Sequence, residues 1–273
     1  MTIQTALLQG HKLLEEAGID VPRLTAEVLL AYATGHDRTW LYAHSTDELI
    51  EVWWIHYGRY LHQRLEGKPT QYITGRQEFY GREFRVTPDV LIPRPETEHV
   101  IEAALEKWLS PGLCVDIGTG SGAIAVTLTL ERDTRVVATD VSEAALRVAQ
   151  GNARNFSAPV DFLTCDLASP LPDGSCALVV SNPPYVALSE RPTLPRELRN
   201  EPEIALFAGE DGLATYRRLI PEASRILQLG GWLVLEIGAT QQDLVRELLT
   251  GWAGVEVRAD LAGLPRVVLA RRC

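Results

Sequence analysis

Cysteine is scarce in this sequence and follows no metal-binding or disulfide pattern. The 273 residues contain four cysteines, with no Cys-x-x-Cys pair and no histidine at metal-ligand spacing from any of them. Three of the four lie in or beside apolar runs, where free cysteine behaves as a small hydrophobic residue. The pattern argues against a disulfide-rich secreted domain and predicts a reduced, intracellular protein.

Long apolar runs are also missing. No segment approaches the roughly 20 apolar residues that a membrane-spanning helix needs. The first residues have neither the apolar core of a signal peptide nor the Arg-rich pattern of a transit peptide. We therefore expect a cytoplasmic protein that makes no membrane contact.

Basic residues are outnumbered by acidic ones. Lysine and arginine total 26 against 36 for aspartate and glutamate, which gives a formal net charge of −10. No basic tract offers the clustered cations that phosphate contacts need, so direct nucleic-acid binding is not expected. The apolar share of 46% and the charged share of 23% are typical of a globular protein, and the length suits one large and one small domain.

The first part of the chain shows helical spacing of apolar residues. Gly18 and Gly35 are placed to end helices, and Pro22 is placed to begin one. The segment 45–48, Ser-Thr-Asp-Glu, matches a capping box and predicts the start of a third helix. We assign a helical domain to residues 1–70.

The pattern changes after residue 70. The segment 79–86 predicts a β-hairpin with its turn at Gly81, and we assign residues 71–90 to a linker. A proline-rich segment at 91–98 then leads into a helix.

Residues 91–273 form the predicted second domain, in which strands and helices alternate. This alternation predicts a mostly parallel sheet that is covered by helices on both faces. The last two strands are joined by too few residues for a crossover helix, so they should pair antiparallel. Strands are expected at 113–117, 135–139, 160–164, 176–180, 232–237, 255–260 and 266–271, and the helices between them at about 121–131, 142–155 and 212–228.

A glycine-rich turn follows the first of these strands. Its sequence is Asp-Ile-Gly-Thr-Gly-Ser-Gly at 116–122. Glycines allow a tight turn and a close approach of a ligand to the main chain, and the next helix offers free N–H groups at its start. Gly118, Gly120 and Ala123 also fit the loose dinucleotide pattern, so a dinucleotide oxidoreductase is one alternative.

Three aspartates lie at or just after the ends of the first three expected strands. Asp140 stands 20 residues after Gly120, where an acid is expected to bind ribose hydroxyls, although it could instead cap the next helix. Asp116 suits the ammonium group of S-adenosylmethionine and would repel a pyrophosphate, or it is a loop residue bonded to backbone. Asp166 is a candidate for the adenine amino group or a plain turn residue.

The fourth strand ends in Ser-Asn-Pro-Pro-Tyr at 181–185. Two prolines cannot continue a strand, and proline stiffens the residue before it. A rigid loop therefore presents the Asn182 amide, the Pro183 carbonyl and the Tyr185 ring, which could also be only an aromatic plug.

Together, the segments 116–122, Asp140 and 182–185 resemble the class I S-adenosylmethionine-dependent methyltransferases. Further segments at 72–75, 78–81, 91–98, 200–202, 212–213 and 260–263 resemble the release factor glutamine N5-methyltransferases, the PrmC/HemK family. This resemblance implies a Rossmann-like, mostly parallel seven-stranded sheet with an antiparallel last strand. It also implies that the helical N-terminal domain engages class I peptide chain release factors, whose Gly-Gly-Gln glutamine is methylated.

The resemblance also implies roles for individual residues. The expected catalytic residues are Asn182, Pro183 and Tyr185. Leu167 occupies a position where the family often has an aromatic residue beside adenine. The expected substrate-binding residues are Asn182, Pro183, Pro184 and Tyr185. The expected cofactor-binding residues are Asp116, Gly118, Thr119, Gly120, Ser121, Gly122, Asp140, Asp166, Leu167 and Asn182.

The residues also suggest a mechanism. Asn182 and Pro183 would accept the two N–H groups of the glutamine amide and aim its nitrogen at the methyl group, while Tyr185 stacks on the amide plane. The product would be S-adenosylhomocysteine, and we expect no metal to be needed. The nearest alternative is a DNA or RNA amino-methyltransferase that acts on adenine N6 or cytosine N4. A third alternative is an inactive binding module.

Overall fold

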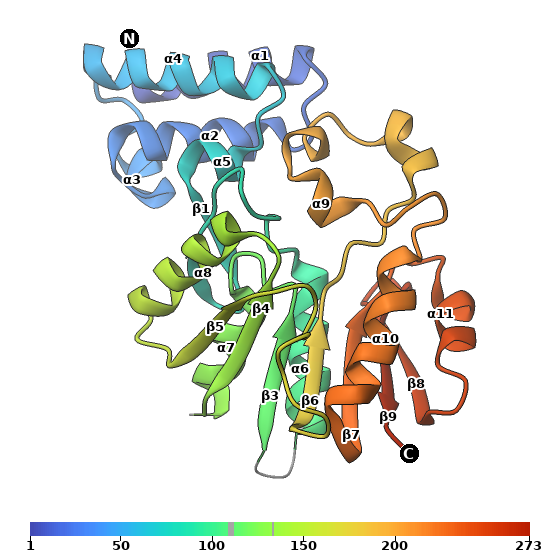
Figure 1. Ribbon diagram of the computed structural model, residues 1–273. Helices are drawn as coiled ribbons and strands as arrows, with labels where there is room; N and C mark the ends of the chain where they lie inside the picture. Colours follow the sequence, from blue (N-terminus) through green and yellow to red (C-terminus); the bar gives the residue numbers. More distant parts are fainter. Residues whose placement is uncertain (109–111, 133) are drawn as a thin grey trace. The chain divides into compact units, whose positions relative to one another are not determined.

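A computed structural model of the protein describes residues 1–108, 112–132 and 134–273 (Figure 1). The chain forms two compact units. The first contains Met1–Gly75 and Pro195–Asn200, and the second contains Arg76–Leu194 and Glu201–Cys273. Within the described residues, no helix combines the length and apolarity needed to cross a membrane.

The first unit is helical, as predicted. Its core is made of buried aliphatic side chains with Tyr57. Its helices are α1 (Ile3–Glu16), α2 (Pro22–Thr34), α3 (Arg38–Ala43), α4 (Glu51–Leu65), α5 (Thr70–Thr74) and the 3-10 helix η3 (Leu198–Asn200). Pro22 begins α2 and Gly35 ends it in a left-handed conformation, which confirms both predictions.

The capping box predicted at 45–48 is wrong. Helix α4 begins later, at Glu51, and its N-cap Ile50 makes no side-chain cap bond. The segment is used for another purpose, because Asp47 O and Ser45 O accept the N–H groups of Ile3 and Gln4. The 45–48 backbone therefore pairs with the start of α1.

The first unit also holds a segment from much later in the chain. Arg64 on α4 donates to the carboxylate of Glu197, and Asn200 Nδ2 donates to Gly67 O at 3.0 Å. The Arg64 side chain is only 4% exposed, so it needs this negative partner. We call residues 195–200 the returning segment.

The second unit is built on a seven-stranded sheet in the order β5-β4-β3-β6-β7-β9-β8. All strands are parallel except β9, which runs antiparallel to both β7 and β8. This confirms the predicted fold class and the antiparallel last strand. The strands are β3 (Leu113–Ile117), β4 (Val136–Asp140), β5 (Val160–Thr164), β6 (Cys176–Ser181), β7 (Leu227–Glu236), β8 (Ala253–Ala259) and β9 (Pro265–Arg271).

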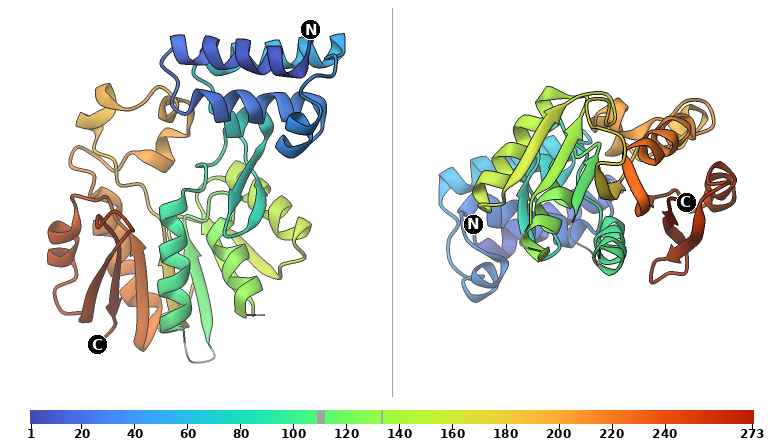
Figure 2. Two further views of the ribbon diagram at one scale, coloured as in Figure 1. Left: turned by 180° about the vertical axis from the view of Figure 1, so that it is seen from behind. Right: turned by 60° about the horizontal axis from the view of Figure 1, so that its bottom comes forward.

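Helices cover both faces of this sheet. Figures 1 and 2 show α6, α7 and α8 on one face and α10 and α11 on the other. Two buried apolar layers result, as expected for a parallel sheet. The helices are α6 (Glu98–Lys107), α7 (Ala123–Arg132), α8 (Glu143–Asn155), α9 (Glu203–Leu206), α10 (Ala214–Ile226) and α11 (Gln242–Leu248), with 3-10 helices η1 (Pro95–Thr97) and η2 (Leu188–Thr193).

The predicted hairpin is present, with strands β1 (Arg76–Phe79) and β2 (Arg82–Arg85). Tyr80 and Gly81 both have positive φ, which is the geometry of a tight two-residue hairpin turn. Buried Phe79 and Phe84 join the core on the α6 and α7 face. The hairpin thus packs within the second unit, while the predicted domain boundaries at residues 70 and 90 stay predictions.

Candidate functional site

The second unit contains a cavity of about 470 Å³ at the carboxyl ends of β3, β4, β5 and β6. This volume is typical of sites for small ligands, and the edge is where parallel sheets bind them. The segments that follow all four strands contribute to the lining, together with parts of 89–97, 202–207 and α10.

The glycine loop enters the cavity through its backbone. Thr139 O on the neighbouring strand accepts the N–H groups of Gly118 and Thr119 at 2.8 and 2.9 Å. Gly118 and Gly120 have φ of +74° and +56°, and a Cβ built on either would meet no atom within 4 Å. Glycine is therefore required for conformation, and the space beside it is open to a ligand. Gly118, Thr119, Gly120 and Ser121 line the cavity.

Gly122 has a different function from the first two glycines. A Cβ there would lie 3.1 Å from the Cβ of Ala149 on α8, and its φ is +82°. It lies outside the lining formed by the described residues. Gly122 lets the start of α7 pack closely on α8, so its predicted cofactor contact stays a prediction.

Asp140 is oriented by backbone donors. Its Oδ2 accepts the N–H of Gly120 and its Oδ1 accepts the N–H of Ser142, each at 2.9 Å. Helix α8 is capped by the Ser142 side chain, which leaves Asp140 free of that task. A carboxylate oxygen has more than one acceptor site, so each oxygen keeps capacity for a hydroxyl donor at the cavity wall.

Asp116 lies behind the glycine loop, outside the lining formed by the described residues. Its Oδ2 accepts the Thr119 hydroxyl at 2.6 Å and the Ala125 N–H at 3.2 Å. Oδ1 is buried without a hydrogen-bond partner among the described residues. Complete burial raises the pKa of Asp116 to about 7. The carboxyl thus braces the loop, and its predicted contact with an ammonium group stays a prediction.

The charges on the cavity wall are mainly negative. Asp89, Asp140 and Asp166 line it, and Arg218 is the one lining cation among the described residues. Arg218 is paired with Asp166. Asp89 and Asp140 have no ion-pair partner in the described ranges, so the wall favours a cationic ligand and disfavours a pyrophosphate.

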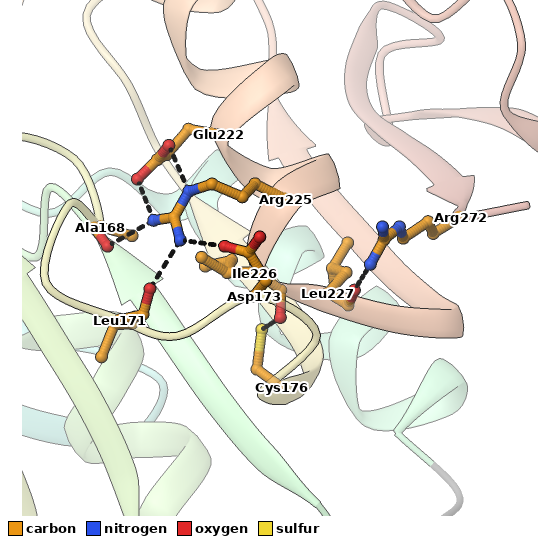
Figure 3. A network of polar contacts seen from close by, with 9 residues as sticks. All are labelled: Ala168, Leu171, Asp173, Cys176, Glu222, Arg225, Ile226, Leu227 and Arg272. Carbon is orange, nitrogen blue, oxygen red and sulfur yellow. Dashed lines mark hydrogen bonds and ion pairs between the residues drawn. The ribbon is translucent and has the colours of Figure 1, made fainter.

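The segment after β5 carries Asp166 and Leu167, which both line the cavity. Leu167 has φ of +52°, a conformation that needs support from its surroundings. Arg225 on α10 supplies support further along this segment (Figure 3). It donates to Leu171 O and Asp173 at 2.7 Å each and to Ala168 O at 3.1 Å.

The Asn-Pro-Pro segment also faces the cavity. Asn182, Pro183 and Pro184 line it, and the Ser181 hydroxyl ties the end of β6 to Ile117 O of β3 at 2.6 Å. The structure therefore brings the predicted acceptor segment, the glycine loop, Asp140, Asp166 and Leu167 to one cavity.

The Asn182 side chain is held by residues from two other elements. Its Nδ2 donates to the hydroxyl of Thr97 on η1 at 3.1 Å. That hydroxyl donates to Oε2 of Glu236, the last residue of β7, at 2.6 Å. Glu236 is 2% exposed, and burial raises its pKa to about 7.

Tyr185 lies outside the lining formed by the described residues. Its hydroxyl donates to Glu236 Oε1 at 3.3 Å, and its ring packs on the core shared by α10 and the sheet. Burial raises the pKa of its phenol. The predicted stacking of Tyr185 on a substrate amide therefore stays a prediction.

The site includes polar residues that were not predicted from the sequence, among them Asp89, Thr97, Arg218 and Glu236. Glu236 carried a usable signal, because it lies next to the last residue of the predicted strand 232–237 and parallel strands present their carboxyl ends at one edge. Thr97 lies in the proline-rich segment 91–98, where only the resemblance drew attention to it. Arg218 lies inside a helix and carried no signal.

Two family models match the chain. The PrmC N-terminal domain matches residues 5–75, and the methyltransferase small domain matches residues 99–208. Among solved structures, a methyltransferase from Pyrococcus furiosus has a TM-score of 0.52 at 18% identity, covering 71% of this chain and 90% of that one. The hMettl16 catalytic domain has a TM-score of 0.59 at 16% identity, covering 78% and 81%. These two likenesses show a methyltransferase fold.

Full-length relatives are much more similar in sequence. The release factor glutamine methyltransferase of Koribacter versatilis is 43% identical over 100% of this chain and 99% of the relative. The Bacillus subtilis protein of the same name is 41% identical over 98% of this chain and 97% of the relative. This chain therefore belongs to the release factor glutamine methyltransferase family.

Proposed function

We propose that this protein transfers a methyl group from S-adenosylmethionine to N5 of the glutamine in the Gly-Gly-Gln motif of peptide chain release factors. The observation that carries the proposal is the position of Asn182 and Pro183 in the same cavity as the glycine loop and Asp140. The names of the full-length relatives support a release factor glutamine as the acceptor.

The charges and hydrogen-bonding groups of the cavity suit S-adenosylmethionine. Asp89 and Asp140 favour its cationic groups, and the open space beside Gly118 and Gly120 accepts a ligand close to the backbone. Bound there, it would supply an electrophilic methyl group on a sulfonium. Asp140 would accept the two ribose hydroxyls, and Leu167 would pack against adenine.

The acceptor amide must be positioned, because delocalisation into its carbonyl weakens the nitrogen as a nucleophile. Since Asn182 Nδ2 donates to Thr97, its Oδ1 is free to accept one substrate N–H. The Pro183 carbonyl would accept the other, and proline brings no competing N–H. With both hydrogens held, the nitrogen lone pair is directed at the methyl group.

The transfer balances without an added reactant. The carbon–sulfur bond breaks with its electron pair staying on sulfur, a nitrogen–carbon bond forms, and one N–H proton leaves to water. The products are N5-methylglutamine and S-adenosylhomocysteine. That no metal takes part stays a prediction.

The helical first unit is proposed to engage the release factor. It matches the PrmC N-terminal domain, a module of the family distinct from the methyltransferase domain. A nucleobase amine is the competing acceptor, because Asn-Pro-Pro-Tyr also suits planar amino groups. The net charge of −10 disfavours it, since a nucleic-acid strand would be repelled.

Mass spectrometry tests the proposal directly. Purified release factor is incubated with the protein and S-adenosylmethionine, and the expected result is one added methyl group on the Gly-Gly-Gln glutamine. A release factor with that glutamine replaced by alanine is the matched control. Methyl transfer to an adenine- or cytosine-containing oligonucleotide, with none to the release factor, would refute the proposal.

A further inference from the structure

Four polar side chains form a continuous hydrogen-bonded chain that begins at the cavity-lining residues Asn182 and Thr97 and continues to Glu236 and Tyr185, which lie outside the lining formed by the described residues. Asn182 Nδ2 donates to Thr97 Oγ1 at 3.1 Å, and Thr97 donates to Glu236 Oε2 at 2.6 Å. Tyr185 donates to Glu236 Oε1 at 3.3 Å. The four residues come from the end of β6, from η1, from the end of β7 and from the loop after β6.

The direction of these hydrogen bonds follows from the number of protons that each group can donate. An ionised carboxylate has no proton and only accepts. The single hydroxyl proton of Thr97 is therefore committed to Glu236, and Thr97 Oγ1 can only accept from Asn182. Because the Asn182 amide donates through Nδ2 to Thr97, its Oδ1 remains available to accept a hydrogen bond from a substrate in the cavity.

We propose that Glu236, acting through Thr97, is a positioning residue that fixes which end of the Asn182 amide faces the substrate. This inference rests on the proposed function, because it assigns Asn182 Oδ1 as the acceptor for the glutamine N–H. A reversed Asn182 would present Nδ2 to a substrate nitrogen that also donates, and the two groups would repel.

Protonation of Glu236 removes the preference for one direction of these hydrogen bonds. A protonated carboxyl competes as a donor to Thr97, which frees the Thr97 proton to turn toward Asn182 and favours the reversed amide. The Glu236 carboxyl is faced by Thr97 and Glu96 from η1, by Tyr185 and by Arg266 on β9. Tyr216 on α10 donates to the Glu236 backbone carbonyl. Burial raises the pKa of Glu236 most, and the hydrogen bonds from Thr97 and Tyr185 lower it. The Glu96 charge raises it further and Arg266 lowers it, with a resulting value of about 7. Turnover should therefore fall as the pH drops through about 7.

The first experiment compares Thr97 variants in single-turnover methylation of release factor. Thr97→Val removes the link, and we expect the single-turnover rate constant to fall about 10- to 100-fold, because the half-buried Asn182 amide loses its partner and its fixed orientation. Affinity for S-adenosylhomocysteine, measured by calorimetry, should change less than threefold. Thr97→Ser keeps the hydroxyl and should restore most of the rate.

Thr127→Val is the matched control. Thr127 is buried on α7, and its hydroxyl has no hydrogen-bond partner among the described residues. The control should keep the wild-type rate. A Thr97→Val enzyme that also keeps the wild-type rate, or a Thr97→Ser enzyme as slow as Thr97→Val, overturns the inference.

The second experiment measures the pH dependence of kcat for the wild type and Glu236→Gln. Glutamine keeps the shape but cannot titrate, so the acid-side decline near pH 7 should disappear in the variant. Its rate above pH 8 should be about 3- to 10-fold lower, because a neutral amide allows both orientations of Thr97.

The outcomes separate this inference from the proposed function. Absence of release factor methylation by the wild type refutes the function itself. Methylation with an acid-side decline that persists in Glu236→Gln refutes the role of Glu236. A decline that persists there and disappears in Asp116→Asn assigns the titration to the other buried carboxyl, and this also refutes the inference.

Discussion

Backbone groups orient the glycine-loop side of the cavity, whereas side chains orient Asn182 on the other side. Gly118 and Gly120 offer open space and main chain, and even Asp140 is oriented by two backbone N–H groups. Asn182 instead depends on Thr97 and Glu236 from separate elements. The first side should tolerate changes that preserve backbone conformation, while the second depends on the identity of each side chain.

Each side is backed by one fully buried carboxyl. Asp116 braces the loop through Thr119 and the start of α7, and Glu236 braces Asn182 through Thr97. In both cases burial raises the pKa to about 7. Both sides therefore carry the free-energy cost of burying a carboxyl group, although one is oriented by backbone and the other by side chains.

The largest expected effect comes from Asn182→Ala. Loss of the oriented acceptor should lower kcat about 100- to 1,000-fold, as for other preorganised polar groups. Affinity for S-adenosylhomocysteine should stay nearly unchanged, because the backbone side is intact. Rapid-quench methylation and calorimetry measure the two quantities. Asn155→Ala, at an exposed position on α8, is the control, and an active Asn182→Ala enzyme would contradict the mechanism.

Gly120→Val should damage the backbone side instead. A β-branched residue at φ of +56° is strained by roughly 1–2 kcal/mol or more, and its side chain would enter the cavity. We expect cofactor affinity to fall about 10- to 100-fold by calorimetry. Gly18→Val places the same residue at φ of +68° in the first unit, where the space is also open. It should leave cofactor affinity unchanged, and equal losses in both variants would show that strain alone matters.

The two buried carboxyls predict a pH-dependent stability. An ordinary unfolded carboxyl has a pKa near 4, while Asp116 and Glu236 keep their protons in the folded protein up to about 7. The folded state binds more protons between these values, so stability falls as the pH rises from about 4 to about 7. The free energy of unfolding in urea should be about 1 kcal/mol lower at pH 8 than at pH 6 for each carboxyl. Asp116→Asn should remove its share, and an unchanged difference would assign the effect to other groups.

Arg225→Lys should have the smallest effect. Lysine cannot reproduce the fork that bridges Ala168 O, Leu171 O and Asp173 (Figure 3). We expect a loss of about 1 kcal/mol in unfolding free energy and a change of less than about threefold in cofactor affinity. Arg147→Lys, on the exposed face of α8, is the control. A larger affinity loss would place the Arg225 segment among the binding determinants.

Strand ends were predictable from the sequence, and the side chains behind them were not. Hydrophobic runs and proline placed Asp140 and Asn182 at the edge where the cavity forms. The same runs could not show that β6 neighbours β7, so Glu236 could not be connected to Asn182. The sequence also could not predict which side chains reach the cavity. Asp116 and Tyr185 belong to segments that line the cavity, yet both lie outside the lining formed by the described residues.

The capping box shows a related limit. Ser45 to Glu48 has the right residues, but its backbone is already paired with the start of α1, a non-local contact that local spacing cannot reveal. Tertiary structure decided the outcome against a local signal.

The returning segment has a consequence for dissecting the protein into parts. The segment 195–200 ends two positions before Pro202, which lines the cavity, yet its partners Arg64 and Gly67 O belong to the first unit. Cutting the chain after Gly75 would strip Glu197 and Asn200 of those partners. An isolated catalytic fragment would therefore be a disturbed enzyme, and a transplanted helical unit would need the matching 195–200 sequence from its own parent.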